Sequence, residues 1–126
     1  MSQRADCVAL DVSIPDVMYA AALRSLDPAG RAEGGTMAER LADAIERFCV
    51  CGASVSADGH EVSLCGMTRR WDREKETFLC GLAPFVMRRC VAVFVARDGD
   101  AWRYRFDGVG GVEVQLLDLL GDGGWE

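Results

Sequence analysis

Apolar and polar residues alternate in several short segments, and this pattern predicts β-strands. In residues 8–14 every second residue is a large apolar one, Val8, Leu10, Val12 and Ile14, which is the period of a strand with one face on a core. The same pattern predicts further strands at residues 53–55, 62–64, 91–97, 100–106 and 112–116.

Three other segments have the composition or spacing of helices. Ser13 and Asp16, with Pro15 between them, have the spacing of a helix start, and the apolar stretch that follows predicts a largely buried helix ending near Leu26. Thr36 and Glu39 form a capping box before an amphipathic helix. A third helix is expected from residue 71 to about residue 86, where Pro84 forces an end or a kink.

The order of these elements predicts the fold class. Strand, two helices, hairpin, helix and three-strand meander (β-α-α-β-β-α-β-β-β) indicate an α+β two-layer sandwich, with three helices on a largely antiparallel sheet. Length and an apolar fraction of 50% are enough for one core, so we expect a single domain over residues 1–120 and a flexible tail over residues 121–126.

Two Asp-Gly dipeptides predict the registers of the hairpins. A two-residue type I′ turn at Asp58-Gly59 would place Val55 opposite Val62. The same turn at Asp98-Gly99 would oppose three pairs on one face, which are Val95 with Trp102, Val93 with Tyr104, and Val91 with Phe106.

That second register leaves one large apolar side chain, Phe94, on the outer face beside Arg103 and Arg105. An exposed aromatic ring flanked by guanidinium groups is typical of a protein contact surface. We therefore expect a partner to bind at Phe94, Arg103 and Arg105. The glycine-rich loop from Gly30 to Gly35, with Arg31, is a second candidate for partner binding because long loops often carry function.

Net charge and hydropathy exclude some partners. The net charge of −6 argues against a large phosphate-binding surface, so nucleic acid is not the expected partner. Single-strand binding through Trp102 and Tyr104 would need both rings exposed, whereas the predicted register buries them. No apolar run approaches the roughly 20 residues of a membrane-spanning helix, so no membrane partner is expected.

The six cysteines lack the paired spacing of a zinc site, and they lie mostly in or beside apolar segments. With charged residues near the N-terminus where a secretory signal would be apolar, the sequence indicates reduced thiols in a cytoplasmic protein. The thiols then pack as small apolar groups. The alternative is a small-ligand or metal-binding protein that uses Cys49, Cys51, Cys65 and His60.

No motif for catalysis or for a cofactor is present. The glycines at 30, 34 and 35 follow a helix and lack the lysine of a phosphate-binding loop, and the lone histidine follows a predicted turn. The expected function is therefore a small non-enzymatic domain that binds another protein or itself. Abundant Ala, Gly, Val and Arg with little Lys suggest an accessory or regulatory protein of a bacterium or mobile element.

Overall fold

The computed structural model describes residues 3–48, 51–67, 70–71, 73–87, 89–96 and 99–117. Within them the chain has three α-helices and antiparallel sheets in close to the expected order, which confirms the predicted α+β class. The helices are α1 (Tyr19–Leu26), preceded by a 3-10 turn at Asp16–Met18, α2 (Met37–Phe48) and α3 (Arg73–Gly81). The strands are β1 (Gln3–Asp11), β2 (Ser13–Pro15), β3 (Cys51–Val55), β4 (Glu61–Met67), β5 (Arg70–Trp71), β6 (Val91–Ala96), β7 (Ala101–Phe106) and β8 (Val112–Leu117).

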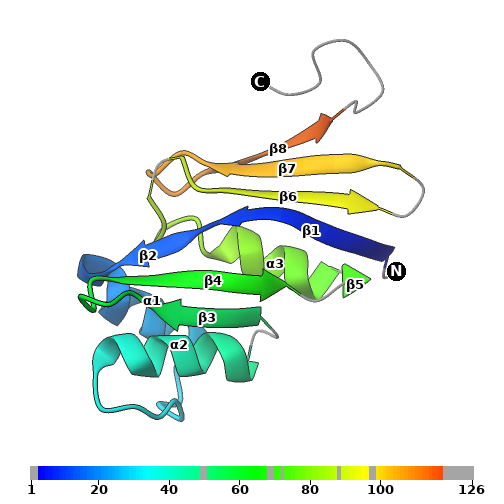
Figure 1. Ribbon diagram of the computed structural model, residues 1–126. Helices are drawn as coiled ribbons and strands as arrows, with labels where there is room; N and C mark the ends of the chain where they lie inside the picture. The colour runs from blue at the N-terminus through cyan, green and yellow to red at the C-terminus, as the bar shows by residue number, and fades with distance from the viewer. Residues whose placement is uncertain are drawn as a thin grey trace.

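The strands form two groups that share one stretch of chain. One sheet has the order β5-β1-β6-β7-β8 and the other has the order β2-β4-β3. Val12 lies between β1 and β2, and its carbonyl accepts a hydrogen bond from the Leu64 amide of β4 at 2.9 Å. In Figure 1 the strands therefore follow one another from β3 to β8 as one continuous layer, with β1 and β2 in the middle.

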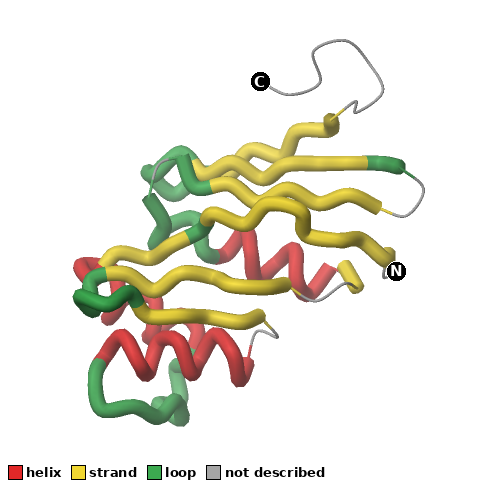
Figure 2. Tube along the Cα trace, viewed as in Figure 1, coloured by secondary structure: helices red, strands yellow, loops and turns green. Residues whose placement is uncertain are grey.

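The helices cover one side of this layer, which we call the inner face. Figures 1 and 2 show α1 and α3 behind the strands and α2 beside β3. Leu41 and Ile45 of α2 are completely buried, as the amphipathic pattern predicts. They belong to the same core cluster as Ile14, Phe94 and Tyr104 from the strands. The opposite, outer face has no helix over it in the described part of the chain.

The register of the first hairpin is as predicted, but its turn is longer. Val55 pairs with Val62, and Ser56 donates its amide hydrogen to the Glu61 carbonyl at 2.9 Å, so four residues form the loop. Gly59 has a φ of 76° and Asp58 does not have positive φ, so the turn is not type I′. Loops of two and four residues centred on the same point give the same register.

The register of the second hairpin differs from the prediction by one residue. The expected pairs of Val91, Val93 and Val95 with Phe106, Tyr104 and Trp102 are wrong. Instead Phe94 pairs with Trp102 and Ala92 pairs with Tyr104, while Val93 pairs with Arg103. Because neighbouring side chains in a strand point to opposite faces, this shift exchanges the faces of β6.

The cause of the shift is the number of residues in the loop. The Ala96 amide donates to the Asp100 carbonyl at 2.7 Å, and the Gly99 amide donates to the Ala96 carbonyl at 3.0 Å. Three residues therefore separate the paired ends, and Gly99 has a φ of 98°, the conformation expected of the last residue of a three-residue loop. A loop of three residues shifts the register by one residue relative to a two-residue turn.

The N-terminal strand contains one irregularity that the alternation did not predict. The register of β1 with β6 shifts between Cys7 and Ala9, so Val8 leaves the ladder and is 56% exposed. Cys7 pairs with Phe94 and Ala9 pairs with Val93, so Val8 has no partner residue on β6. Ser13 belongs to β2 and does not cap a helix, since no side chain caps the 3-10 turn that follows.

The third helix is shorter than predicted. It begins at Arg73 and ends at Gly81, before Pro84, and Trp71 lies in the short strand β5. Leu82 and Ala83 are still buried, in the turns after the helix. The expected tail at residues 121–126 lies outside the described residues.

Candidate functional site

The outer face of β7 carries two of the predicted binding residues, and both already have neighbours on β8. Arg103 is opposite Gln115 and donates a hydrogen bond to its side-chain oxygen Oε1. Arg105 is opposite Glu113, with 3.3 Å between the guanidinium Nη2 and the carboxylate Oε1. The structure therefore brings Arg103 and Arg105 together, but in contacts that link two strands of the sheet.

Phe94 does not share that surface. It is fully buried, with its ring stacked 6.0 Å from the ring of Trp102 and edge-on to the ring of Tyr104 at 5.8 Å. The prediction that Phe94 lies on the outer face is wrong, because the three-residue loop turns it toward the helices. Trp102 and Tyr104 are also buried, as expected, so these rings are not a platform for stacking bases.

The inner face of β8 carries an apolar row in which Val112 is half-buried against the core and the two later residues are uncovered. We call Val112, Val114 and Leu116 the β8 strip. These side chains lie on the same face as Phe106, Tyr104 and Trp102, their partners on β7. The β7 residues are buried, whereas Val114 is 53% and Leu116 is 83% exposed. Figure 1 shows why, since no helix lies behind β8.

Among the strands that the structure describes, none covers the backbone edge of β8. In the described residues β8 pairs with β7 alone and ends the sheet, and its register with β7 is regular. Its sequence, VEVQLL, has no proline, lysine or inward-pointing charge, the devices that usually block an edge strand. At the opposite end of the layer, β3 is less suited to receive another strand. Its register with β4 is irregular between Cys51 and Ala53, and it packs against α2.

The sequence indicated β8 as a strand but not as an uncovered edge. The missing information was the position of the helices. Three helices of about 10 Å each could span six strands spaced about 4.8 Å apart, so a count of elements does not indicate an uncovered row. The exposure of the β8 strip depends on where the helices lie, since α3 lies behind β1, α2 lies beside β3, and no described helix lies behind β8.

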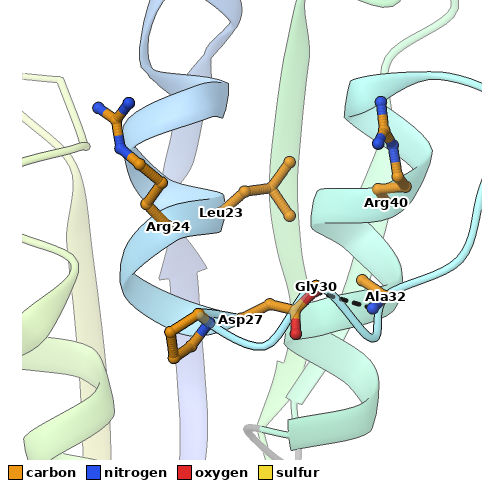
Figure 3. A pocket seen from close by; sticks show the side chains of 7 residues that line it. Leu23, Arg24, Asp27, Gly30, Ala32 and Arg40 are labelled. Atoms are coloured by element: carbon orange, nitrogen blue, oxygen red, sulfur yellow. Dashed lines mark hydrogen bonds between the residues drawn. The ribbon is translucent and has the colours of Figure 1, made fainter.

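The predicted loop surface forms a hollow between α1 and α2, shown in Figure 3. This α1–α2 hollow has a volume of about 440 Å³ and is lined by Leu23, Arg24, Asp27, Pro28, Gly30, Ala32 and Arg40. Leu23 points into the space between the helices, Arg24 points to the far side of α1, and Arg40 extends along α2.

Asp27 organises the loop that closes this hollow. Its carboxylate accepts hydrogen bonds from the Arg31 amide at 2.9 Å and from the Ala32 amide at 2.8 Å. The bonds from Ala32 and Arg31 lower the pKa of Asp27, so its charge is satisfied by the backbone. Gly30 has a φ of 69°, which the tight loop requires.

Within the described residues, three guanidinium groups near the hollow form no salt bridge. The Arg31 side chain is exposed on the same loop, and neither it nor Arg24 or Arg40 forms a salt bridge within the described residues. Arg47 nearby is paired with Asp43 at 3.3 Å. The carboxylate of Asp27 also interacts electrostatically with Arg31 and Arg47, so the hollow carries charges of both signs.

The alternative site of cysteines and histidine is not assembled in the described residues. Cys51 is buried and Cys65 is exposed, while His60 lies 2.6 Å from the Asp16 carboxylate, measured from its Nδ1. Cys49 lies outside the described residues. No three His, Cys, Asp or Glu side chains come close enough in the described part to hold a metal ion.

His60 and Asp16 join the first hairpin to the start of the α1 segment. The Asp16 amide donates to the His60 carbonyl at 2.9 Å, and the Tyr19 hydroxyl donates to the Gly59 carbonyl at 3.0 Å. The hydrogen bond with Asp16, together with the charge of Asp58, raises the pKa of His60. These contacts explain His60 as a structural link.

Comparisons with protein families, with curated proteins and with solved structures found no match. Among the described helices, none combines the length and the apolar character needed to cross a membrane.

Proposed function

We propose that this chain is a small non-enzymatic protein-binding domain, and that its partner docks at β8 by adding a strand to the sheet. The observation that carries the proposal is the coincidence of an open backbone edge with the β8 strip on one side of it. Arg103 and Arg105 then act from the outer face of the neighbouring strand, where they hold Gln115 and Glu113 in place.

The energetics favour an extended partner. A strand added to an edge gains backbone hydrogen bonds, and alternate side chains give specificity. Covering exposed aliphatic side chains such as Leu116 and Val114 contributes about 1 to 2 kcal/mol each. The expected partner segment is therefore extended, with apolar side chains on the face that meets the β8 strip.

Position-specific photocrosslinking tests the proposal. A benzophenone amino acid replaces Leu116 in the β8 strip or, as the matched control, exposed Ser54 on the outer face of β3. We expect a discrete crosslinked product in an extract of the native host from position 116 and none from position 54. Val114→Arg in the same chain should remove the product. Equal products at both positions, or none at position 116, would contradict the proposal.

A second candidate is binding of a small acidic ligand in the α1–α2 hollow. Arg40 offers a positive charge and Leu23 offers an apolar wall, which suits a carboxylate on a short aliphatic chain. Octanoate should shift the amide NMR signals of Ala32 and its neighbours, and Arg40→Gln should weaken binding. Octanol, which lacks the carboxylate, is the control, and equal binding of both would exclude a role for Arg40.

The proposal includes a cytoplasmic setting with reduced thiols. Its support is the packing of Cys51 and Cys90, which are buried and serve as small apolar residues in the core. Bacterial or mobile-element origin remains a proposal based on composition alone.

A further inference from the structure

We infer that the strand that docks on β8 is β8 of a second copy of this chain, antiparallel to the first about a two-fold axis. This inference rests on the proposed function and specifies its partner. It follows from the sequence of the strand, which is complementary to itself in one register.

Apolar matching restricts the possible registers. In an antiparallel pair, residues opposite each other lie on the same face of the sheet. The β8 strip of one copy therefore meets the β8 strip of the other only when even-numbered residues lie opposite even-numbered residues. The central registers that pair even-numbered with odd-numbered residues would instead place Leu116 opposite Glu113 or Gln115 of the outer face.

Polar groups on the outer face select one of these registers. With Val114 on the two-fold axis, Glu113 of each copy lies opposite Gln115 of the other. The Gln115 oxygen already accepts from Arg103, which leaves its amide N–H groups to donate. Glu113 uses Oε1 toward Arg105, and its other carboxylate oxygen has acceptor capacity. Two amide-to-carboxylate hydrogen bonds thus form by symmetry.

The neighbouring registers lack this complementarity. With Gln115 on the axis, Glu113 would lie opposite Leu117, which belongs to the small apolar cluster of the outer face with Val93 and Ala101. With Glu113 on the axis, the two carboxylates would lie opposite each other and repel. The register centred on Val114 also opposes Val112 to Leu116, so the whole β8 strip is covered.

The dimer should be weak and dependent on concentration. Its contact is a single strand of 6 residues in each copy, extended by the β8 strip. Such an interface is at the small end of specific protein contacts, and we expect a Kd on the order of 10 µM.

A charge exchange across the axis tests both the partner and the register. Gln115→Glu places a second carboxylate opposite Glu113 of the other copy, while within one copy it keeps an acceptor oxygen for Arg103. The fold is therefore retained and association should weaken by at least about tenfold. The double variant Glu113→Gln with Gln115→Glu restores one donor and one acceptor in each pair, and its association should return to within about threefold of wild type.

Sedimentation velocity from about 1 µM to about 500 µM measures association of each chain, a range chosen around the expected Kd. Thermal unfolding at low concentration verifies that each variant folds. Leu116→Arg should remain monomeric throughout. A wild-type chain that stays monomeric, a Gln115→Glu variant that associates like wild type, or a double variant that does not recover would each overturn the inference.

The outcomes separate this inference from the proposed function. If wild type stays monomeric but position 116 crosslinks to a different protein, the second copy is excluded and strand addition stands. If wild type stays monomeric and position 116 gives no product, both proposals fail.

Discussion

Replacement of Phe94 by alanine is the most direct test of the observed sheet register. The ring is completely buried and contacts the rings of Trp102, 6.0 Å away, and Tyr104, 5.8 Å away. Phe→Ala changes at such core positions cost about 3 to 5 kcal/mol, from lost apolar burial and from the cavity that remains. Total stabilities of small domains are about 5 to 15 kcal/mol, so the loss should be large.

Urea denaturation followed by circular dichroism measures this loss as the difference in free energy of unfolding. Leu116→Ala is the matched control, since Leu116 projects from the same inner face but is 83% exposed. At a protein concentration low enough to keep the chain monomeric, the control should change stability by no more than about 0.5 kcal/mol.

The two registers predict different results for Phe94→Ala. If the turn held two residues, Phe94 would point to the outer face, and its truncation would leave the packing of Trp102 and Tyr104 on the inner face intact. A loss below about 1 kcal/mol, or one equal to that of Leu116→Ala, would refute the three-residue loop and the core that follows from it.

Two further predictions concern the pH dependence of stability and the room for a side chain at two glycines. The pKa of His60 is raised above its ordinary 6.5 by Asp16, so the stability that this pair contributes should be complete below that pH and disappear as the pH rises through the raised value. The melting temperature of wild type should therefore exceed that of Asp16→Asn more at pH 5 than at pH 8, and an equal difference at both would contradict the link. A Cβ on Gly52 would lie 2.5 Å from the Cys65 carbonyl oxygen, so Gly52→Ala should lower the melting temperature, whereas Gly81→Ala, with open space around it, should not.

The positions of strands and helices could be predicted from the sequence more accurately than the faces to which the side chains of β6 point. Alternation and capping depend on neighbouring residues, so the strands at β6 to β8 and the start of α2 could be recognised. The registers depended on loop length. Both Asp-Gly turns were expected to hold two residues; the one near Asp58 holds four, which keeps the register, and the one near Gly99 holds three, which changes it.

The candidate site was predictable only in part. Arg103 and Arg105 were correctly expected on the outer face, because alternation within β7 is local, but their partners Gln115 and Glu113 depend on the β7–β8 register. The exposure of Leu116 depends on where the helices stop, and no local pattern contains that information.

The central position of β1 and β2 has a consequence for synthesis on the ribosome. Ala5 of β1 pairs with Ala96 of β6, so the strand made first must wait for one of the last before its ladder can close. The partner of β2 is made earlier, since β2 pairs with β4 through Ile14 opposite Val62. A nascent chain should therefore assemble the β2-β4-β3 half with α1 and α2 first, and acquire resistance to protease over β1 only after β6 has left the exit tunnel.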